Sequence, residues 1–321
     1  MSENRIDTSQ KHPGDTAAEV VCFGMITPAV VMVVDDFPQH NTGVPVREVG
    51  EFVFDDASIV AGLLREWSVP TGLIGTVLGN DPAGHRVADK LNSLGILGQV
   101  RFSSNTTTPL EVNISDPSGG RTFFWQRPPD TLASLDTADL AILTGARLLY
   151  LDWYDGDHIL RPMRAAKQND IPVFLNLEYG HQEPDILERY TQGTTICQVI
   201  TDPAQSEENP LAVARKVLRT GVRTVVVTLW AEGCLAAQGN EAIRILGPTV
   251  PTIDGCGAGA TFSAGFIYGY LHGWDMEKAA RFATAAASLK CTVIGPRAFP
   301  VDEVNQMATE LQVQRFLIPD A

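Results

Sequence analysis

The sequence lacks the long apolar segments that are typical of membrane proteins. No hydrophobic run reaches the ~18 uninterrupted apolar residues that a membrane-spanning helix needs, and residues 1–18 contain no apolar core like that of a signal peptide. These absences exclude a transmembrane helix and a secretory leader. We therefore expect a cytoplasmic protein.

Cysteine is also scarce. The sequence has no Cys-x-x-Cys pair, and its five cysteines are widely spaced: Cys22, Cys197, Cys234, Cys256 and Cys291. An odd number at such spacings favours reduced, buried thiols over disulfides or a zinc centre. The sequence predicts no metal site.

Positive charge is in deficit. Only 24 lysines and arginines oppose 38 aspartates and glutamates, which gives a formal net charge of −14. Such a chain repels nucleic acid and anionic lipid, and no basic cluster with interleaved aromatic residues offsets the repulsion. We expect neither nucleic acid nor a membrane surface as a partner.

The sequence does contain enough apolar residues for one large core, since 44% of its 321 residues are hydrophobic. Residues 1–18 are polar and aperiodic, which predicts a disordered leader before a first strand at Val20–Phe23. Short β-branched runs then alternate with helical segments, at residues 71–76, 147–151, 171–175 and 223–229, the last one after a helix at 207–220. This alternation predicts an α/β fold, with a parallel sheet covered by helices.

Two further stretches, near residues 45–54 and 109–126, alternate apolar and polar side chains as antiparallel strands do. We expect them to form a small sheet beside a main domain at 19–313, which leaves a tail at 314–321. The second stretch carries Phe123, Phe124 and Trp125. These rings could cover a ligand or pack in a core or against a second subunit, and packing is the preferred interpretation.

The most informative motif is IDGCGAGATFSAG at residues 253–265, followed by an apolar segment. Gly257, Ala258 and Gly259 lead directly into a predicted helix, so free backbone N–H groups and the helix dipole converge there. The three residues predict an anion hole. Close packing of the helix against a strand is the alternative explanation of the small residues.

The motif resembles the C-terminal signature of PfkB-type carbohydrate kinases, DTxGAGDxFxxG; the matching residues are Asp254, Gly257, Ala258, Gly259, Thr261, Phe262 and Gly265. The segments LIGTVLGNDPAG, VVVTLWAEGC and ARFATAAASLKCTVIGPRAFP resemble other conserved stretches of the family, so the resemblance covers residues 20 to 303. It implies a ribokinase-like three-layer α/β/α sandwich with a β-sheet lid, a small-molecule ligand, ATP and Mg²⁺ as cofactors, and a homodimer formed through the lid.

The chain departs from this family at the catalytic position. The resemblance places the aspartate that accepts the proton of the substrate hydroxyl at Ala260, whose methyl group accepts no proton. A positioned base contributes typically ~10²–10⁴-fold to such a reaction. The substitution therefore predicts a divergent member that does not transfer phosphoryl groups.

Other family positions differ as well. Asp55 and Asp56 stand where the resemblance places a substrate-binding glycine pair, and Pro28 and Ala29 occupy the place of a substrate-gripping aspartate. On the nucleotide side the resemblance marks five positions, where the metal-region NxxE pattern reduces to Asp202-x-x-Gln205 and an indole replaces a turn glycine: Asp202, Gln205, Thr228, Trp230 and Gly233.

Polar residues also follow two predicted strands. Asp152, Asp155, Asp157 and His158 lie in LDWYDGDH; a carboxylate-lined pocket is conceivable, but we interpret the aspartates at 155–157 as a solvated turn that caps the next helix. Asn176 and Glu178 end another strand, where open α/β sheets place their ligands. Together with Asp55 and Asp56, they are the candidate substrate residues.

Three hypotheses remain open from the sequence. The preferred one is a pseudokinase that keeps an anion-binding site and acts through binding or regulation. The second is a working ATP-dependent carbohydrate kinase in which Ala260 was introduced in the laboratory. The third is an enzyme with different chemistry, in which carboxylates such as Asp55, Asp56 or Glu178 act as acid and base in the old cleft.

Overall fold

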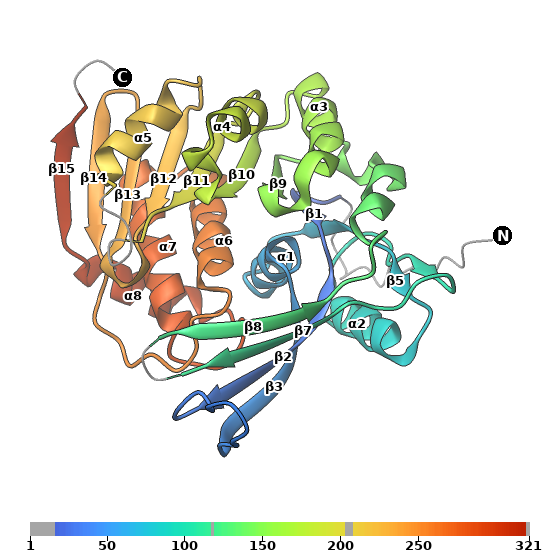
Figure 1. Cartoon of the computed structure of the whole chain (residues 1–321). Coiled ribbons are helices and arrows are strands. Elements are labelled where there is room, and N and C mark those ends of the chain that lie inside the picture. Colours follow the sequence, from blue (N-terminus) through green and yellow to red (C-terminus); the bar gives the residue numbers. More distant parts are fainter. Residues whose placement is uncertain (1–16, 117–118, 203–207, 319–321) are drawn as a thin grey trace.

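A nine-stranded sheet forms the centre of the protein (Figure 1). The computed structural model describes residues 17–116, 119–202 and 208–318. The sheet has the order β15-β14-β13-β12-β11-β10-β9-β1-β4. Its strands are β1 (Val20–Gly24), β4 (Thr71–Gly75), β9 (Leu148–Asp152), β10 (Val173–Glu178), β11 (Ile196–Ile200), β12 (Thr224–Thr228), β13 (Gly233–Gln238), β14 (Glu241–Leu246) and β15 (Val313–Leu317).

The neighbouring strands β4, β1, β9, β10, β11 and β12 run parallel to one another. The strands β13, β14 and β15 extend the sheet, each antiparallel to the strand before it. Every residue of β1 and β9 is buried, because both faces of a parallel sheet are covered. Val20 and Cys22 point into one core, whereas Val21 and Phe23 point into the other. The predicted parallel sheet is confirmed.

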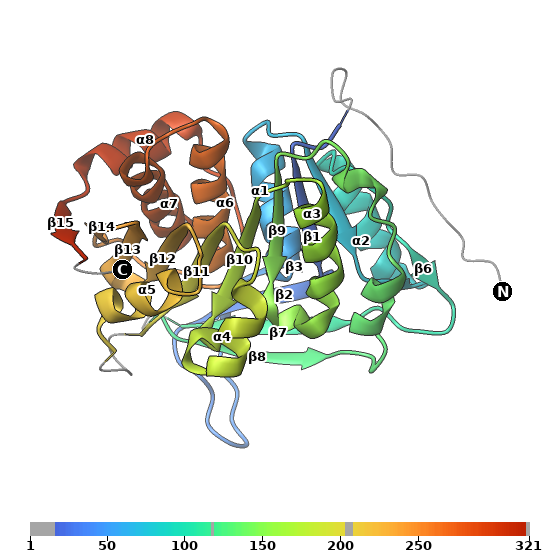
Figure 2. The same ribbon diagram turned by 90° about the horizontal axis from the view of Figure 1, so that it is seen from above.

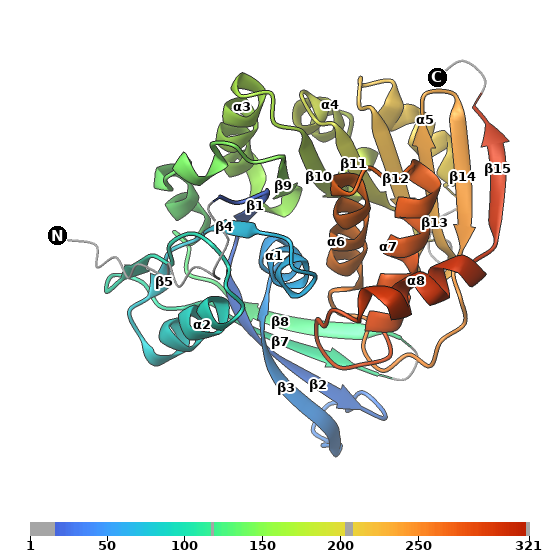
Figure 3. The ribbon, with the colours of Figure 1, turned by 180° about the vertical axis from the view of Figure 1, so that it is seen from behind.

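Helices cover both faces in three layers, seen from above in Figure 2. One face carries α1, α2, α6, α7 and α8, which stand in front of the sheet in Figure 3, and the other carries α3, α4 and α5. The helices are α1 (Asp56–Glu66), α2 (Pro82–Ser93), α3 (Leu160–Gln168), α4 (Pro184–Thr191), α5 (Pro210–Leu218), α6 (Ala258–Leu271), α7 (Met276–Lys290) and α8 (Val301–Glu310). The expected helix at 207–220 is thus α5, three residues later at its start; residues 203–207 lie outside the described ranges.

A second sheet, the lid, lies across one end of the molecule at the bottom of Figure 1. Its order is β3-β2-β7-β8, from the strands β2 (Thr27–Val34), β3 (Val46–Phe54), β7 (Leu110–Ser115) and β8 (Arg121–Gln126). The two expected segments are present, but the expectation of an antiparallel sheet is corrected, because β2 pairs with β7 in parallel. Sequence analysis did not predict β2 as a strand.

The domain boundaries at both ends of the chain differ from those expected. Residues 1–16 of the expected leader lie outside the described residues, and Ala18 is already buried in the core. The expected tail at 314–321 is wrong for its first part, because Val313–Leu317 form the edge strand β15 and pair with β14. Ile318, which follows β15, packs in the hydrophobic core and so holds this segment against the main domain.

The remaining elements are short. A two-residue ladder joins β5 (Leu78–Gly79) to β6 (Phe102–Ser103), and five 3₁₀ turns connect larger elements: η1 (Leu132–Thr137), η2 (Ala141–Leu143), η3 (Trp153–Ile159), η4 (Tyr179–Gln182) and η5 (Trp230–Glu232). All five cysteines are free thiols and four are buried, as the sequence predicted. In the described ranges we find no helix with the length and apolarity needed to cross a membrane.

Candidate functional site

The glycine motif forms the N-terminus of α6. Gly257 caps the helix with a φ of 79°, a backbone conformation that favours glycine. The N–H of Ala258 donates to Gly255 O (3.3 Å) and that of Thr261 to Gly257 O (2.9 Å). The intervening first-turn N–H groups belong to Gly259 and Ala260, and helix geometry leaves such groups without an intrahelical acceptor. The free donors of this turn are thus those of Gly259 and Ala260, whereas the Ala258 N–H is already used, and the anion hole at Gly257, Ala258 and Gly259 stays a prediction.

Asp254 holds this motif in place. Its carboxylate accepts hydrogen bonds from Ser115 Oγ (2.6 Å), Cys256 N (2.9 Å) and Gly295 N (2.8 Å), and it pairs with the fully buried Lys290 Nζ at 2.8 Å. Burial alone would raise the pKa of Asp254, but the Lys290 ammonium and the donated hydrogen bonds hold it below its usual range. One carboxylate therefore connects the lid, the glycine motif and the C-terminus of α7.

Ala260 lies in the first turn of α6 and is 1% exposed. Its methyl group belongs to the hydrophobic core between α6 and the sheet. Sequence analysis missed the polar residues beside it. Gln198, in β11, donates to Gly259 O (3.3 Å) and accepts from Ser263 Oγ (2.9 Å), so these side chains fix the first turn of the helix.

Three carboxylates come together from three separate elements. Asp56 begins α1, Asp152 ends β9 and Glu178 ends β10, and one carboxylate oxygen of each lies within 4.8 Å of the others. The register of β9 and β10 pairs Asp152 with Asn176. Sequence analysis considered a carboxylate-lined pocket at Asp152 and placed Asn176 and Glu178 at a strand end, but it preferred a solvated turn and predicted no metal ligands. It did not bring Asp152 together with Asp56.

Burial dominates the electrostatics of this group. It raises the pKa of Asp56 to about 7, with a further contribution from the charge of Glu178. Burial and the charge of Asp56 raise the pKa of Asp152 well above its usual range, and burial also raises the pKa of Glu178. Burial therefore favours the protonated forms of these three carboxyl groups when no cation is bound.

A cavity of about 140 Å³ lies between this group and the lid. Its walls come from β3, α1, β7, β8 and the glycine motif, and include Asp55, Asp56, Glu111, Arg121 and Gly257. Arg127 pairs with Asp55 (3.3 Å) and Glu111 (3.5 Å). Burial raises the pKa of Asp55 to about 6 against the opposing charge of Arg127. The cavity is polar and charged, as suits a small hydrophilic ligand.

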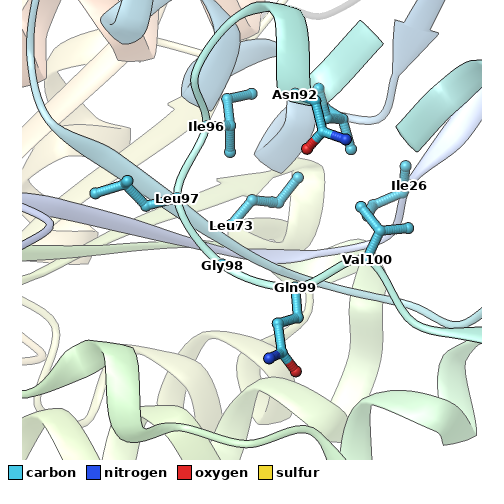
Figure 4. A pocket seen from close by; sticks show the side chains of 9 residues that line it. Ile26, Leu73, Asn92, Ile96, Leu97, Gly98, Gln99 and Val100 are labelled. Carbon is cyan, nitrogen blue, oxygen red and sulfur yellow. The ribbon is translucent and has the colours of Figure 1, made fainter. Parts of the chain in front are cut away.

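A smaller cavity, of about 10 Å³, lies near the C-terminal end of α2 (Figure 4). It is lined mainly by apolar side chains around Asn92, whose Oδ1 atom has no hydrogen-bond partner among the described residues. The volume approaches that of a single water molecule, which would satisfy this atom. It is too small for a substrate.

The nucleotide-side candidates gather at one end of β12. Thr228 ends this strand, Trp230 begins η5 and Gly233 begins β13 with a φ of 92°. Asp202 is buried just beyond β11. Gln205 lies outside the described residues. The Trp230 indole is 47% exposed, and the guanidinium of Arg121 from the lid lies over it.

Three residues of the site have left-handed backbones that ordinarily suit glycine: Asp55 (φ 69°), Glu178 (φ 47°) and Trp230 (φ 51°). Sequence analysis expected family glycines at the positions of Asp55 and Trp230, and a positive φ at both is compatible with that expectation. Such a conformation costs about 1–3 kcal/mol for a residue other than glycine.

The LDWYDGDH segment differs from its predicted form. Asp155 is 4% exposed, so the interpretation of a fully solvated turn is wrong for this residue. Asp157 is exposed and pairs with Arg189, and the ring of His158 lies 2.7 Å from Asp136 Oδ1. Asp152 caps η3 by accepting from Tyr154 N (2.8 Å) while its other oxygen faces Asn176. Two of these aspartates, Asp152 and Asp155, are buried beside the site, whereas Asp157 is exposed to solvent.

Sequence comparison relates this chain to sugar kinases. It is 34% identical over 235 residues to an uncharacterized sugar kinase of Archaeoglobus fulgidus, covering 71% of this chain and 93% of that protein. It is 29% identical over 244 residues to a ribokinase of Arabidopsis thaliana, covering 70% and 63% of the two chains.

Solved structures show the same fold. A putative ribokinase from Agrobacterium tumefaciens matches with a TM-score of 0.80 at 20% identity, over 92% of this chain and 98% of that one. A ribokinase from Thermotoga maritima matches with a TM-score of 0.74 at 19% identity, over 91% and 100%. The predicted ribokinase-like three-layer fold is confirmed. The model of the pfkB family of carbohydrate kinases matches residues 18–303, so this chain belongs to that family.

Proposed function

We propose that this protein is a pseudokinase of the pfkB family, which binds a small polar ligand beneath its lid but does not transfer a phosphoryl group to it. The observation that carries the proposal is Ala260, a buried methyl group at the position that the family signature gives to its base. The glycine motif, the lid and a polar cavity support ligand binding.

Electrostatics supports the same proposal. Phosphoryl transfer needs positive charge around the developing negative charge of the phosphate oxygens. Here Asp56, Asp152 and Glu178 stand together close to the first turn of α6. These three side chains supply none of the positive charge that phosphoryl transfer needs.

The nucleotide side does not fit the ATP and Mg²⁺ of the family. An exposed indole at Trp230 replaces a glycine, and Arg121 from the lid lies over its ring. The Trp230 side chain reduces the space on the side of the site where the family binds its nucleotide.

The number of departures favours natural divergence over a laboratory change at Ala260. One substitution is enough to disable a kinase. In this chain Asp55 and Trp230 also occupy glycine-type backbones, and each accepts a strained conformation. These independent changes are expected of a site that has lost one activity and kept the fold.

A second candidate function rests on Glu178. A Cβ atom on Gly259 would lie 3.9 Å from Glu178 Oε1, so this carboxylate adjoins the turn that holds Ala260. Burial raises the pKa of Glu178, which improves a carboxylate as a proton acceptor near neutral pH. An enzyme that removes a proton from a ligand hydroxyl through Glu178 would reuse the same cavity.

One experiment separates these hypotheses. ADP release is measured from ATP with a panel of pentoses, hexoses and nucleosides, for the wild type, Ala260→Asp and Glu178→Gln. We expect no turnover from any of the three proteins. Wild-type turnover at the ~1–100 s⁻¹ of ordinary kinases would contradict the proposal, and its loss in Glu178→Gln would identify that residue as the base. Activity in Ala260→Asp alone would support the laboratory origin of Ala260.

A further inference from the structure

The carboxylate group at Asp56, Asp152 and Glu178 contains one more polar side chain. Asn176, on β10, is 0% exposed and points its amide into the group. Its Nδ2 atom lies 2.8 Å from Asp152 Oδ2, 2.8 Å from Glu178 Oε1 and 3.0 Å from Asp56 Oδ2. Three carboxylates thus share a single nitrogen.

An amide nitrogen carries two hydrogens, so Asn176 can satisfy two of these three oxygens at once. The third oxygen has to share a hydrogen. The other atom of the amide is not satisfied either, since Asn176 Oδ1 is buried and has no hydrogen-bond partner among the described residues. A buried polar group without a partner is rare and calls for an explanation.

A cation accounts for the crowding of the three carboxylates. Rotation of the Asn176 amide by half a turn exchanges Oδ1 and Nδ2, which directs a fourth oxygen at the three carboxylates. Four oxygens, with no histidine or cysteine in the group, form the donor set that hard divalent cations prefer. A charge of +2 also removes most of the repulsion among three carboxylates.

We propose that Asp56, Asp152, Glu178 and Asn176 form a binding site for one hard divalent cation, with Ca²⁺ preferred to Mg²⁺. One carboxylate oxygen from each acidic residue lies within 4.8 Å of the others. Ca²⁺ accepts oxygen ligands in flexible geometry, whereas Mg²⁺ demands a nearly ideal octahedron, so ligands drawn from three separate elements favour Ca²⁺.

The site has a route of entry, because Asp56 also lines the cavity of about 140 Å³ beneath the lid. An ion held there would keep coordination positions on the cavity side. Hydroxyl or carboxylate oxygens of a bound ligand could fill these positions. The ion would thus connect the acidic group to ligand binding.

The test is calorimetric titration of the full chain, freed of metal with a chelator, with CaCl₂ and separately with MgCl₂, in the absence of nucleotide and sugar. We expect one site per chain, tighter binding of Ca²⁺ than of Mg²⁺, and a Ca²⁺-dependent rise in Tm. Absence of both heat and a Tm rise at ~10 mM CaCl₂, which is beyond the millimolar affinities of weak protein sites, would overturn the proposal. The readout needs no catalysis, so it stands apart from the kinase assay.

Variants assign the site. Asp152→Asn and Glu178→Gln should each weaken Ca²⁺ binding ~10-fold or more, and Asn176→Asp should strengthen it. Asp157→Asn, which changes an exposed carboxylate that follows β9 and pairs with Arg189, is the control and should leave Ca²⁺ binding unchanged. Unchanged Ca²⁺ binding in Glu178→Gln and Asp152→Asn would overturn the assignment; if Asp152→Asn does not fold, Glu178→Gln decides.

Discussion

The guanidinium carbon of Arg121, in lid strand β8, lies 6.0 Å from the ring centroid of Trp230, at the end of β12. The two residues are 109 positions apart in sequence (230 − 121). A contact of this kind contributes about 0.5–1 kcal/mol at an exposed position. It connects the lid directly to the side of the site where the family places its nucleotide.

Replacement of Trp230 tests what this indole does. Trp230 has a φ of 51°, so Trp230→Gly relieves backbone strain that Trp230→Ala retains. We expect the glycine variant to be more stable than the alanine variant by about 1 kcal/mol in chemical denaturation. Both variants remove the indole, and both should bind ADP at least ~10-fold more tightly than the wild type if the ring obstructs the nucleotide. Equal ADP affinity in all three proteins would contradict the obstruction.

The anion hole predicts a saturable effect of sulfate on the Tm. Sulfate stabilises many proteins without binding, so the site-specific part has to be separated by a variant. A side chain at Gly259 has room, because the nearest atom to its Cβ would be Glu178 Oε1 at 3.9 Å. Gly259→Asp should abolish the saturable rise in Tm through repulsion of the anion. Gly43→Asp adds the same charge at a position where no atom lies within 4 Å of the new Cβ, and this variant should retain the saturable rise in Tm. A wild-type response that is linear in sulfate would argue against the anion hole.

Acidification should lower the free energy of unfolding through protonation of Asp254. Its pKa is lowered in the folded state, so the ionised form contributes stability above the unfolded value of ~4, and this contribution is lost as the pH falls through the folded value. Lys290→Met leaves the buried carboxylate without its ion pair, which should lower the free energy of unfolding by about 3–5 kcal/mol at pH 7.

The loss in Lys290→Met should be smaller at pH 4, because protonation removes the unpaired charge. Chemical denaturation at both pH values measures the difference. Lys90→Met, at an exposed position in α2, is the control and should change the free energy little at either pH. A loss that is equal at pH 7 and pH 4 would show that Lys290 acts through packing and not through the charge of Asp254.

The lid should mediate a dimer. Its edge strand β8 exposes Phe123, Phe124 and Trp125, with 56% of Phe124 accessible. Exposed aromatic groups on a strand edge favour association with another sheet. We expect sedimentation to show a dimer that Phe124→Glu dissociates. Leu317→Glu, on the edge strand β15 of the main sheet, should leave it intact. A monomeric wild type at ~100 µM would contradict this expectation, because stable interfaces have lower Kd values.

Local sequence patterns determined the architecture. Buried parallel strands need apolar residues on both faces, so the segments at 147–151 and 223–229 could be recognised from composition alone. The N-terminus of α6 was equally predictable, since Gly257 with its positive φ and the small residues after it mark a helix start. The absence of disulfides followed from the number and spacing of cysteines.

Only the tertiary structure decided how the site is assembled. Asp56, Asp152 and Glu178 are distant in sequence, and the sheet register together with the packing of α1 brings their oxygens within 4.8 Å. Sequence analysis did not predict the strand β2, which pairs with β3 and β7 in the lid. Burial is the common physical reason: periodicity along the chain predicts which face of an element is covered, but charges and pKa values depend on which residues from other elements cover it.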